Sequence, residues 1–128
     1  MFDNYIIQDK GFRNTYEKGE RTGFIVKARI NYYRGIPLSM LEDVQVAVDG
    51  EHFTTDDMTF IVNDIRYTFK EMNTVSNINW FFGDDLTIEI RKPGGLTPGS
   101  KEVEMWLTPR NSYFGKFQAY MKRTMTFA

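Results

Sequence analysis

The chain is 128 residues long, enough for one hydrophobic core, so we expect a single domain over residues 1–128. Sixteen Lys and Arg side chains against seventeen Asp and Glu leave a formal charge of -1, which argues against a nucleic-acid partner because such proteins need excess positive charge. There is no cysteine, which excludes a disulfide framework, a thiolate zinc site and a cysteine nucleophile.

The chain begins MFDNYIIQDK, which lacks the basic start and the long apolar stretch of a signal peptide. No later segment approaches the ~18 consecutive apolar residues of a membrane-spanning helix. Together with the missing cysteines, these features predict a soluble protein of the cytoplasm.

The first predicted strand covers residues 23–33, where apolar and polar side chains alternate with a period of two residues. Its inward side consists of Phe24, Val26, Ala28, Ile30 and Tyr32. Before the next strand, Ser39 and Glu42 have capping-box spacing, which allows at most one helical turn. Residues 43–49 alternate again, around three valines. Residues 49–51 then predict a turn.

Residues 58–62 and 65–69 alternate in the same way on either side of Asn63 and Asp64. Both turn residues tolerate a positive φ, so the two segments and the turn between them predict a tight hairpin. Residues 73–79 have no convincing period and are expected to form a loop or a short turn of helix.

Residues 85–91 and 102–107 are two further alternating strands. The glycines and prolines of residues 93–99 predict the turn between them, with Leu96 available to fill the end of a core.

The last predicted strand covers residues 117–127. Arg123 interrupts its apolar side, which indicates a sheet edge, a bulge or a surface where another chain packs. About seven or eight strands without a sustained helix predict an all-β fold, a single antiparallel β-sandwich of immunoglobulin-like or fibronectin-like character.

Residues that could carry catalysis are few. His52 is the only histidine, and we expect it to be a solvated residue at the start of a strand. The adjacent acids at 56–57 and 84–85 are interpreted as turn or cap residues, because neighbouring side chains in a strand point to opposite faces. The stretch RKPGG has no following helix and no Lys-Ser or Lys-Thr pair, so it does not predict a phosphate loop.

Aromatic residues make up 16% of the chain and include two unusual clusters. Trp80, Phe81 and Phe82 are consecutive and cannot all face one side of a strand, so at least one is exposed, bent inward or covered by a partner. Tyr113 and Phe114 begin a second cluster, which continues to Phe117 and Tyr120 in a predicted loop. Core packing and a protein or ligand surface are both open for this cluster.

Two stretches of the chain are distinctive: INYYRGIPLSMLEDVQVAVDGE, residues 30–51, and WFFGDDLTIEIRKPGGLTPGSKEVEM, residues 80–105. Both closely resemble the small β subunit of bacterial C-glycoside deglycosidases. The strings at 32–39 and 82–99 are the most specific parts of the resemblance. Neither is a general catalytic motif, so the resemblance identifies a family rather than a mechanism.

The resemblance implies a partner and a reaction. Members of this family pair with a larger α subunit that is similar to a sugar-phosphate isomerase barrel, in a higher hetero-oligomer. Together they cleave the carbon–carbon bond between a sugar and a flavonoid or other aromatic aglycone in a 3-keto C-glycoside, by elimination. The divalent metal, usually manganese, and the base are attributed to the α subunit. We therefore expect no catalytic residue, metal ligand or bound cofactor on this chain.

The resemblance gives the aromatic segments a role as a partner interface. Rigid residues with large contact groups cost little entropy on binding, and Arg34 adds a planar donor. The predicted interface residues are Tyr33, Arg34, Ile36, Pro37, Trp80, Phe81, Phe82, Tyr113 and Phe114. In the alternative interpretation, residues 32–39 only connect two strands and cover an edge of the chain's own sheet.

Two other functions remain open from the sequence alone. One is a free-standing carbohydrate-binding β-sandwich, in which exposed Trp80 and Trp106 stack on sugar rings. The other is a structural adaptor of a different barrel enzyme.

Overall fold

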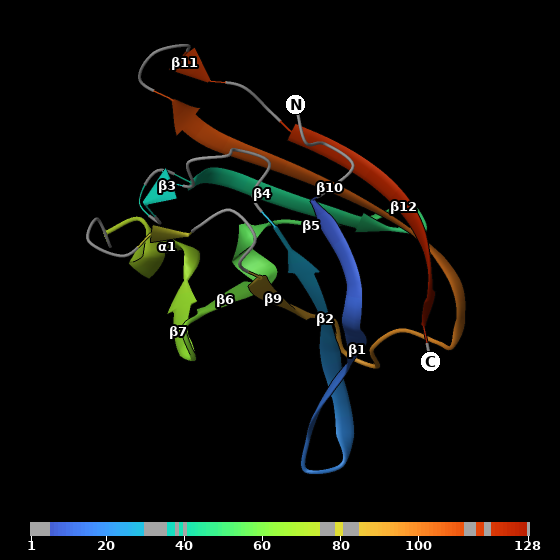
Figure 1. Ribbon diagram of the computed structural model, residues 1–128. Coiled ribbons are helices and arrows are strands. Elements are labelled where there is room, and N and C mark those ends of the chain that lie inside the picture. Colours follow the sequence, from blue (N-terminus) through green and yellow to red (C-terminus); the bar gives the residue numbers. More distant parts are fainter. Residues whose placement is uncertain are drawn as a thin grey trace.

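The computed structural model describes residues 6–29, 36–37, 39, 41–74, 79–80, 85–111, 115–116 and 119–127. Two antiparallel sheets lie face to face in it (Figure 1). The first sheet has five strands, in the order β1 (Ile7–Glu17), β2 (Glu20–Ala28), β9 (Leu86–Arg91), β6 (Met58–Val62) and β7 (Ile65–Thr68).

The second sheet is built around one long strand, β10 (Gly99–Asn111). Its neighbours are β4 (Leu41–Val48), which is followed by β5 (Glu51–Phe53), and on the other side β12 (Ala119–Phe127) and β11 (Gly115–Lys116). A separate pair of short strands consists of β3 (Ile36–Pro37) and β8 (Asn79–Trp80). The two short helical turns are η3 (Thr55–Asp57) and α1 (Phe69–Met72).

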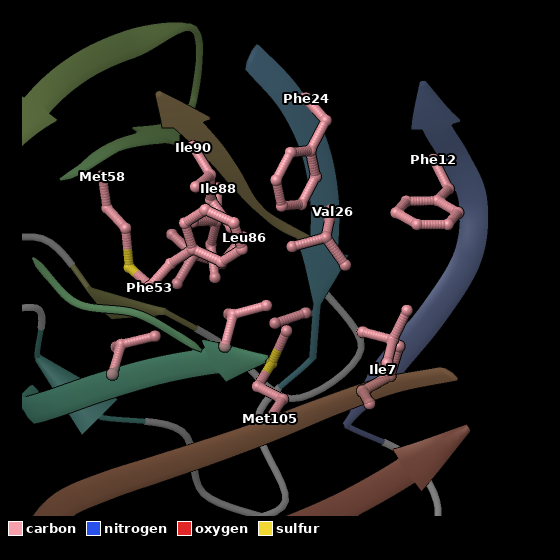
Figure 2. Packing of buried hydrophobic residues seen from close by; sticks show 14 of the residues in the cluster. Ile7, Phe12, Phe24, Val26, Phe53, Met58, Leu86, Ile88, Ile90 and Met105 are labelled. Atoms are coloured by element: carbon pink, nitrogen blue, oxygen red, sulfur yellow. The ribbon is translucent and has the colours of Figure 1, made fainter. Parts of the chain in front are cut away.

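The core lies between the two sheets and confirms the predicted sandwich. Side chains from β2 and β9 meet those from β4 and β10, as Figure 2 shows for Val26, Ile88 and Met105. These positions are fully buried, as the alternation in the sequence predicts. Phe24 and Phe53 add an edge-to-face pair with ring centroids 5.3 Å apart.

The first predicted strand is shorter than its pattern. β2 ends at Ala28, because its partner β9 begins at Leu86 and the ladder between them has no further rung. Arg29 leaves the ladder and pairs through Nε with Oδ1 of Asp85 at 2.8 Å. Residues 30–33 lie outside the described residues, so the inward positions of Ile30 and Tyr32 stay a prediction.

The sequence did not predict β1, although it is eleven residues long. Gly11 has a φ of 79°, and the register with β2 shifts between Gln8 and Arg13, so side chains do not alternate regularly there. β1 closes one side of the sandwich beside β12: Arg123 donates from Nη1 to the backbone oxygen of Ile7 at 2.9 Å. Arg123 therefore does mark a sheet edge, and β1 of the opposite sheet covers it.

Two of the predicted turns, at Asp49 and at Asn63–Asp64, are confirmed. Asn63 and Asp64 connect β6 and β7 with φ values of 53° and 65°, and Asp49 connects β4 and β5 with a φ of 49°. The predicted strand 65–69 is wrong at its end, because Phe69 begins α1. Thr68 caps this turn, since its Oγ1 accepts the Glu71 N–H at 3.1 Å while the Glu71 carboxylate accepts the Thr68 N–H at 2.9 Å.

Leu96 fills the end of the core, as predicted for the turn at 93–99. Asn14 of β1 holds it in place: the side-chain amide of Asn14 donates to the Leu96 oxygen at 2.9 Å and accepts from the Leu96 N–H at 2.8 Å. The turn is thus tied to a strand that is distant in sequence.

Candidate functional site

The short strand β3 and the helical turn α1 lie on the left in Figure 1, and β11 lies above them. The backbone pairing relates β3 and β11 to the same end of β10. β3 precedes the first residue of β4, Leu41, which pairs with Pro109 of β10. The next two residues of β10, Arg110 and Asn111, pair with β11. We call this part of the molecule the β3–β8 end.

Some of the predicted interface residues are brought together at the β3–β8 end. Ile36 pairs with Trp80 and Pro37 with Asn79, although the two strands are more than forty positions apart in the sequence. Their backbones are therefore neighbours, as a shared surface requires. The other predicted residues, Tyr33, Arg34, Phe81, Phe82, Tyr113 and Phe114, lie outside the described residues, and their roles stay predictions.

A row of aromatic rings crosses the second sheet. His52 of β5 stacks on Trp106 of β10 with ring centroids 5.6 Å apart and planes 25° apart. Tyr120 of β12 lies 5.2 Å from Trp106 with a tilt of 42°. These residues are partly or fully exposed and their strand neighbours Met105 and Leu107 are buried, so the row lies on the outer face.

Tyr120 is held by an acidic neighbour on this face. Its phenol donates to Oε2 of Glu104 at 2.5 Å, and this hydrogen bond raises the pKa of Tyr120 above its ordinary value. Tyr120 pairs with Trp106 within the β10–β12 ladder, which confirms the predicted strand at this residue and corrects its grouping with the aromatic loop. Its neighbours hold it as a fixed part of the sheet surface.

The candidate catalytic residues that the structure describes occupy structural positions, and Asp84 lies outside the described residues. Asp56 and Asp57 lie in the helical turn η3, and Asp57 is 3.8 Å from the Arg91 guanidinium. Asp85 is paired with Arg29. His52 is exposed in β5, as expected. Among the residues that the structure describes, no three His, Cys, Asp or Glu side chains are grouped closely enough to hold a metal ion.

Similarity to known proteins covers most of the chain. Residues 2–113 match the family described as C-glycoside deglycosidase beta subunit. The chain belongs to this family. A C-glycoside deglycosidase beta subunit of Eubacterium cellulosolvens is 32% identical over 112 residues, which cover 87% of this chain and 76% of the relative. A 3'-dehydrocarminate deglycosidase beta subunit of a Microbacterium species is 34% identical over 95 residues, which cover 73% of this chain and 70% of the relative.

The family match confirms the resemblance found in the sequence and locates it on the fold. In this C-glycoside deglycosidase β-subunit family, the matched region includes β3, β8 and nearly all the predicted interface residues, and it ends at residue 113. β12, which carries Tyr120 and Arg123, follows the matched region. No helix in the described part of this family member is long and apolar enough to span a membrane.

Sequence reasoning missed the partners of Trp106 in this β subunit. His52 comes from β5, which β4 separates from β10, and Tyr120 comes from β12; both are distant from Trp106 in sequence. A local signal for Tyr120 exists, because exposed Lys122 and Thr124 follow it at a period of two residues. The position of His52 has no such signal, since the rung that it occupies depends on pairing between strands.

Proposed function

We propose that this β subunit is the non-catalytic component of a heteromeric C-glycoside deglycosidase in the cytoplasm. Its partner would be a larger α subunit with a sugar-phosphate isomerase-like barrel, which carries the catalytic base and a divalent metal, manganese by the family resemblance. The observation that supports this proposal is membership of a family whose members are named as beta subunits of deglycosidases.

The proposed reaction is an elimination on a 3-keto C-glycoside, and the name 3'-dehydrocarminate deglycosidase of one relative fits such a substrate. A ketone at C3 acidifies the C2 proton, so a base can remove it to give an enolate. The metal, when bound to the partner, supplies positive charge beside the enolate. The electron pair then forms a C1–C2 double bond while the C1–aglycone bond breaks, and the departing aglycone carbon takes up a proton.

In this proposal the chain stabilises and shapes the complex rather than contributing reacting groups. The pairing of Ile36 with Trp80 supports the β3–β8 end as the partner surface, because two predicted interface segments lie side by side there. Aromatic and arginine residues are the groups that most often dominate the binding energy of an interface.

The test is reconstitution. The chain and a candidate α subunit, encoded by a neighbouring gene, are purified separately, and release of the aglycone from a 3-keto C-glycoside is followed by chromatography. We expect activity from the mixture and none from the β chain alone. Turnover by the β chain without a partner would overturn the division of roles.

Two further measurements separate the alternatives. Gel filtration should show a complex with the α subunit, whereas a free-standing carbohydrate-binding module or an adaptor of another enzyme would elute without it. Calorimetric titration of the β chain with Mn²⁺ should show no stoichiometric binding, because manganese needs several converging oxygen or imidazole ligands. Micromolar binding to this chain alone would contradict the proposed location of the metal.

A further inference from the structure

A cleft of about 680 Å³ opens on the first sheet, on the face turned away from the core. Thr59 and Glu89 pair across β6 and β9 and both line it, whereas their strand neighbours Phe60 and Ile88 are buried. All five strands of this sheet and η3 contribute residues to it. Small-molecule sites typically occupy roughly 300–1,000 Å³, so the cleft has the size of a binding site.

A glycine of β2 lies between two of the residues that line the cleft. Gly23 of β2 pairs with Thr15 of β1 on one side and with Arg91 of β9 on the other, so no side chain rises between these two. A Cβ at Gly23 would overlap the backbone oxygen of Ile90, which excludes even alanine without a shift of the backbone. The strands on either side of Gly23 therefore lie too close for a side chain at this position.

A β-bulge brings two hydroxyl groups into the cleft. Tyr16 pairs with Arg21, and the register shifts there by one residue relative to Thr15, so Thr22 has no rung of its own in the ladder. The hydroxyls of Thr15 and Thr22 lie 3.0 Å apart, and both residues line the cleft. They form a pair that can both donate and accept hydrogen bonds.

The charged groups of the cleft balance one another. Three guanidinium groups and three carboxylates line it, so it is neutral overall. Arg66 is fixed to Glu89 at 2.8 Å, and Arg91 lies 3.8 Å from Asp57. Arg13 is exposed and has no ion pair within the described part of the chain, so its guanidinium is available to a ligand.

One aromatic ring is exposed at the cleft. Tyr16 is 59% exposed, the most exposed large hydrophobic side chain among the described residues. A tyrosine ring offers an apolar face together with a polar tip. Planar donors and acceptors, paired hydroxyls and an exposed ring suit a ligand that carries many hydroxyl groups and one apolar face.

We infer that this cleft is a binding site for a neutral pyranoside, with Tyr16 against the apolar face of the sugar ring and Arg13 donating to its hydroxyls. The balanced charges oppose a phosphate or sulfate ligand, which needs an excess of positive charge. The cleft consists of residues outside the β3–β8 end and needs no partner chain. The inference therefore does not depend on the proposed function.

The test is an NMR titration of the full ¹⁵N-labelled chain with methyl β-D-glucopyranoside, with sodium sulfate in a parallel experiment. We expect saturable shifts of the amide signals of residues 13–17 and of the Arg13 side-chain N–H, with millimolar affinity. Arg13→Met should weaken binding about ten-fold, the effect of losing one hydrogen bond to a charged group. Tyr16→Ala should weaken it by about three-fold or more.

Matched variants control for general surface effects. Arg21→Met removes an exposed arginine of β2 outside the cleft lining, and Tyr120→Ala removes an exposed tyrosine of the other sheet. Neither should change the affinity, and the spectrum of each variant reports whether it is folded. Shifts that do not saturate, that centre on Trp106 and Tyr120, or that are stronger with sulfate would overturn the assignment.

Discussion

Gly23 shows how one residue can permit a close approach between two strands. It lies between Thr15 and Arg91 in the cross-strand pairing, and its missing side chain leaves room for the Ile90 backbone oxygen. Glycine is needed here because of this close approach, since Gly23 is not among the glycines with a positive φ.

We expect Gly23→Ala to lower the free energy of unfolding by about 3 kcal/mol, because the added methyl group must displace backbone rather than a flexible side chain. Urea denaturation followed by tryptophan fluorescence measures this loss. Gly94→Ala is the control, since Gly94 has a φ of 86° and open space around it, and left-handed strain alone should cost about 1–2 kcal/mol. An equal loss in both variants would show that the close approach relaxes freely.

At the scale of the secondary-structure element, the end of β7 illustrates a competition between two local patterns. The apolar alternation favours a strand through Phe69, but Thr68 and Glu71 have the spacing of a capping box. The capping box forms, so the strand ends at Thr68 and α1 begins at Phe69. Phe69 packs on Phe60 with ring centroids 5.9 Å apart. Packing of α1 against the first sheet therefore reinforces a short helical turn that would not persist alone.

The capping box predicts a pH dependence of stability. Hydrogen bonds from the Thr68 backbone and side chain keep the pKa of Glu71 below its ordinary value of 4.5, so the carboxylate form stabilises the fold. This contribution is present above pH 4.5 and is lost as the pH falls through the lower pKa of the folded state. Denaturation curves at several pH values should show a smaller acid-induced loss in Glu71→Gln than in the native chain. An unchanged pH profile would contradict the prediction.

A second contact between elements joins the two sheets along one side. Arg123 of β12 donates to the Ile7 oxygen of β1, so a charged side chain bridges the edges of opposite sheets. Arg123→Met should lower the free energy of unfolding by about 1–3 kcal/mol, because the hydrogen bond to a charged group is lost.

Lys122→Met on the same strand is the matched control, since Lys122 forms an exposed ion pair with Glu102 at 3.2 Å. Exposed pairs of this kind contribute about 0–1 kcal/mol. Thermal and urea melts of both variants check the difference. If the two variants lose the same stability, the bridge from Arg123 does not hold the edges together.

At the scale of the whole molecule, the β3–β8 end and the outer face of the second sheet are two separate parts of the structure. The first includes Trp80, and the second includes Trp106 with His52 and Tyr120. The proposed function assigns the partner to the β3–β8 end, so substitutions at the two tryptophans should affect association differently.

We expect Trp80→Ala and Arg34→Ala to weaken association with the α subunit by at least about 1–2 kcal/mol, the threshold of a hot-spot residue. Trp106→Ala should leave association unchanged. Calorimetry of the two subunits measures binding, and thermal melts of each variant establish that it is folded. Loss of binding in Trp106→Ala with normal binding in Trp80→Ala would move the interface to the outer face of the second sheet.

The sequence by itself determined the local features of this protein. Alternation at a period of two residues gave the buried positions of β2, β4, β9 and β10, because inward and outward side chains are fixed by the geometry of each strand. The turn at Asn63 and Asp64 followed from the residues that tolerate a positive φ. The family could also be identified from the sequence, since the matched region spans residues 2–113.

Only the tertiary structure decided which strands become neighbours. β1 was not predicted, because Gly11 and the register shifts interrupt the alternation of its side chains. Its position is determined by pairing with β2 and by contact with β12. The pairing of Ile36 with Trp80, the aromatic row and the cleft beside Tyr16 each combine strands that are distant in sequence. A local pattern records which face of a strand is buried, but the choice of partner depends on the packing of the whole core.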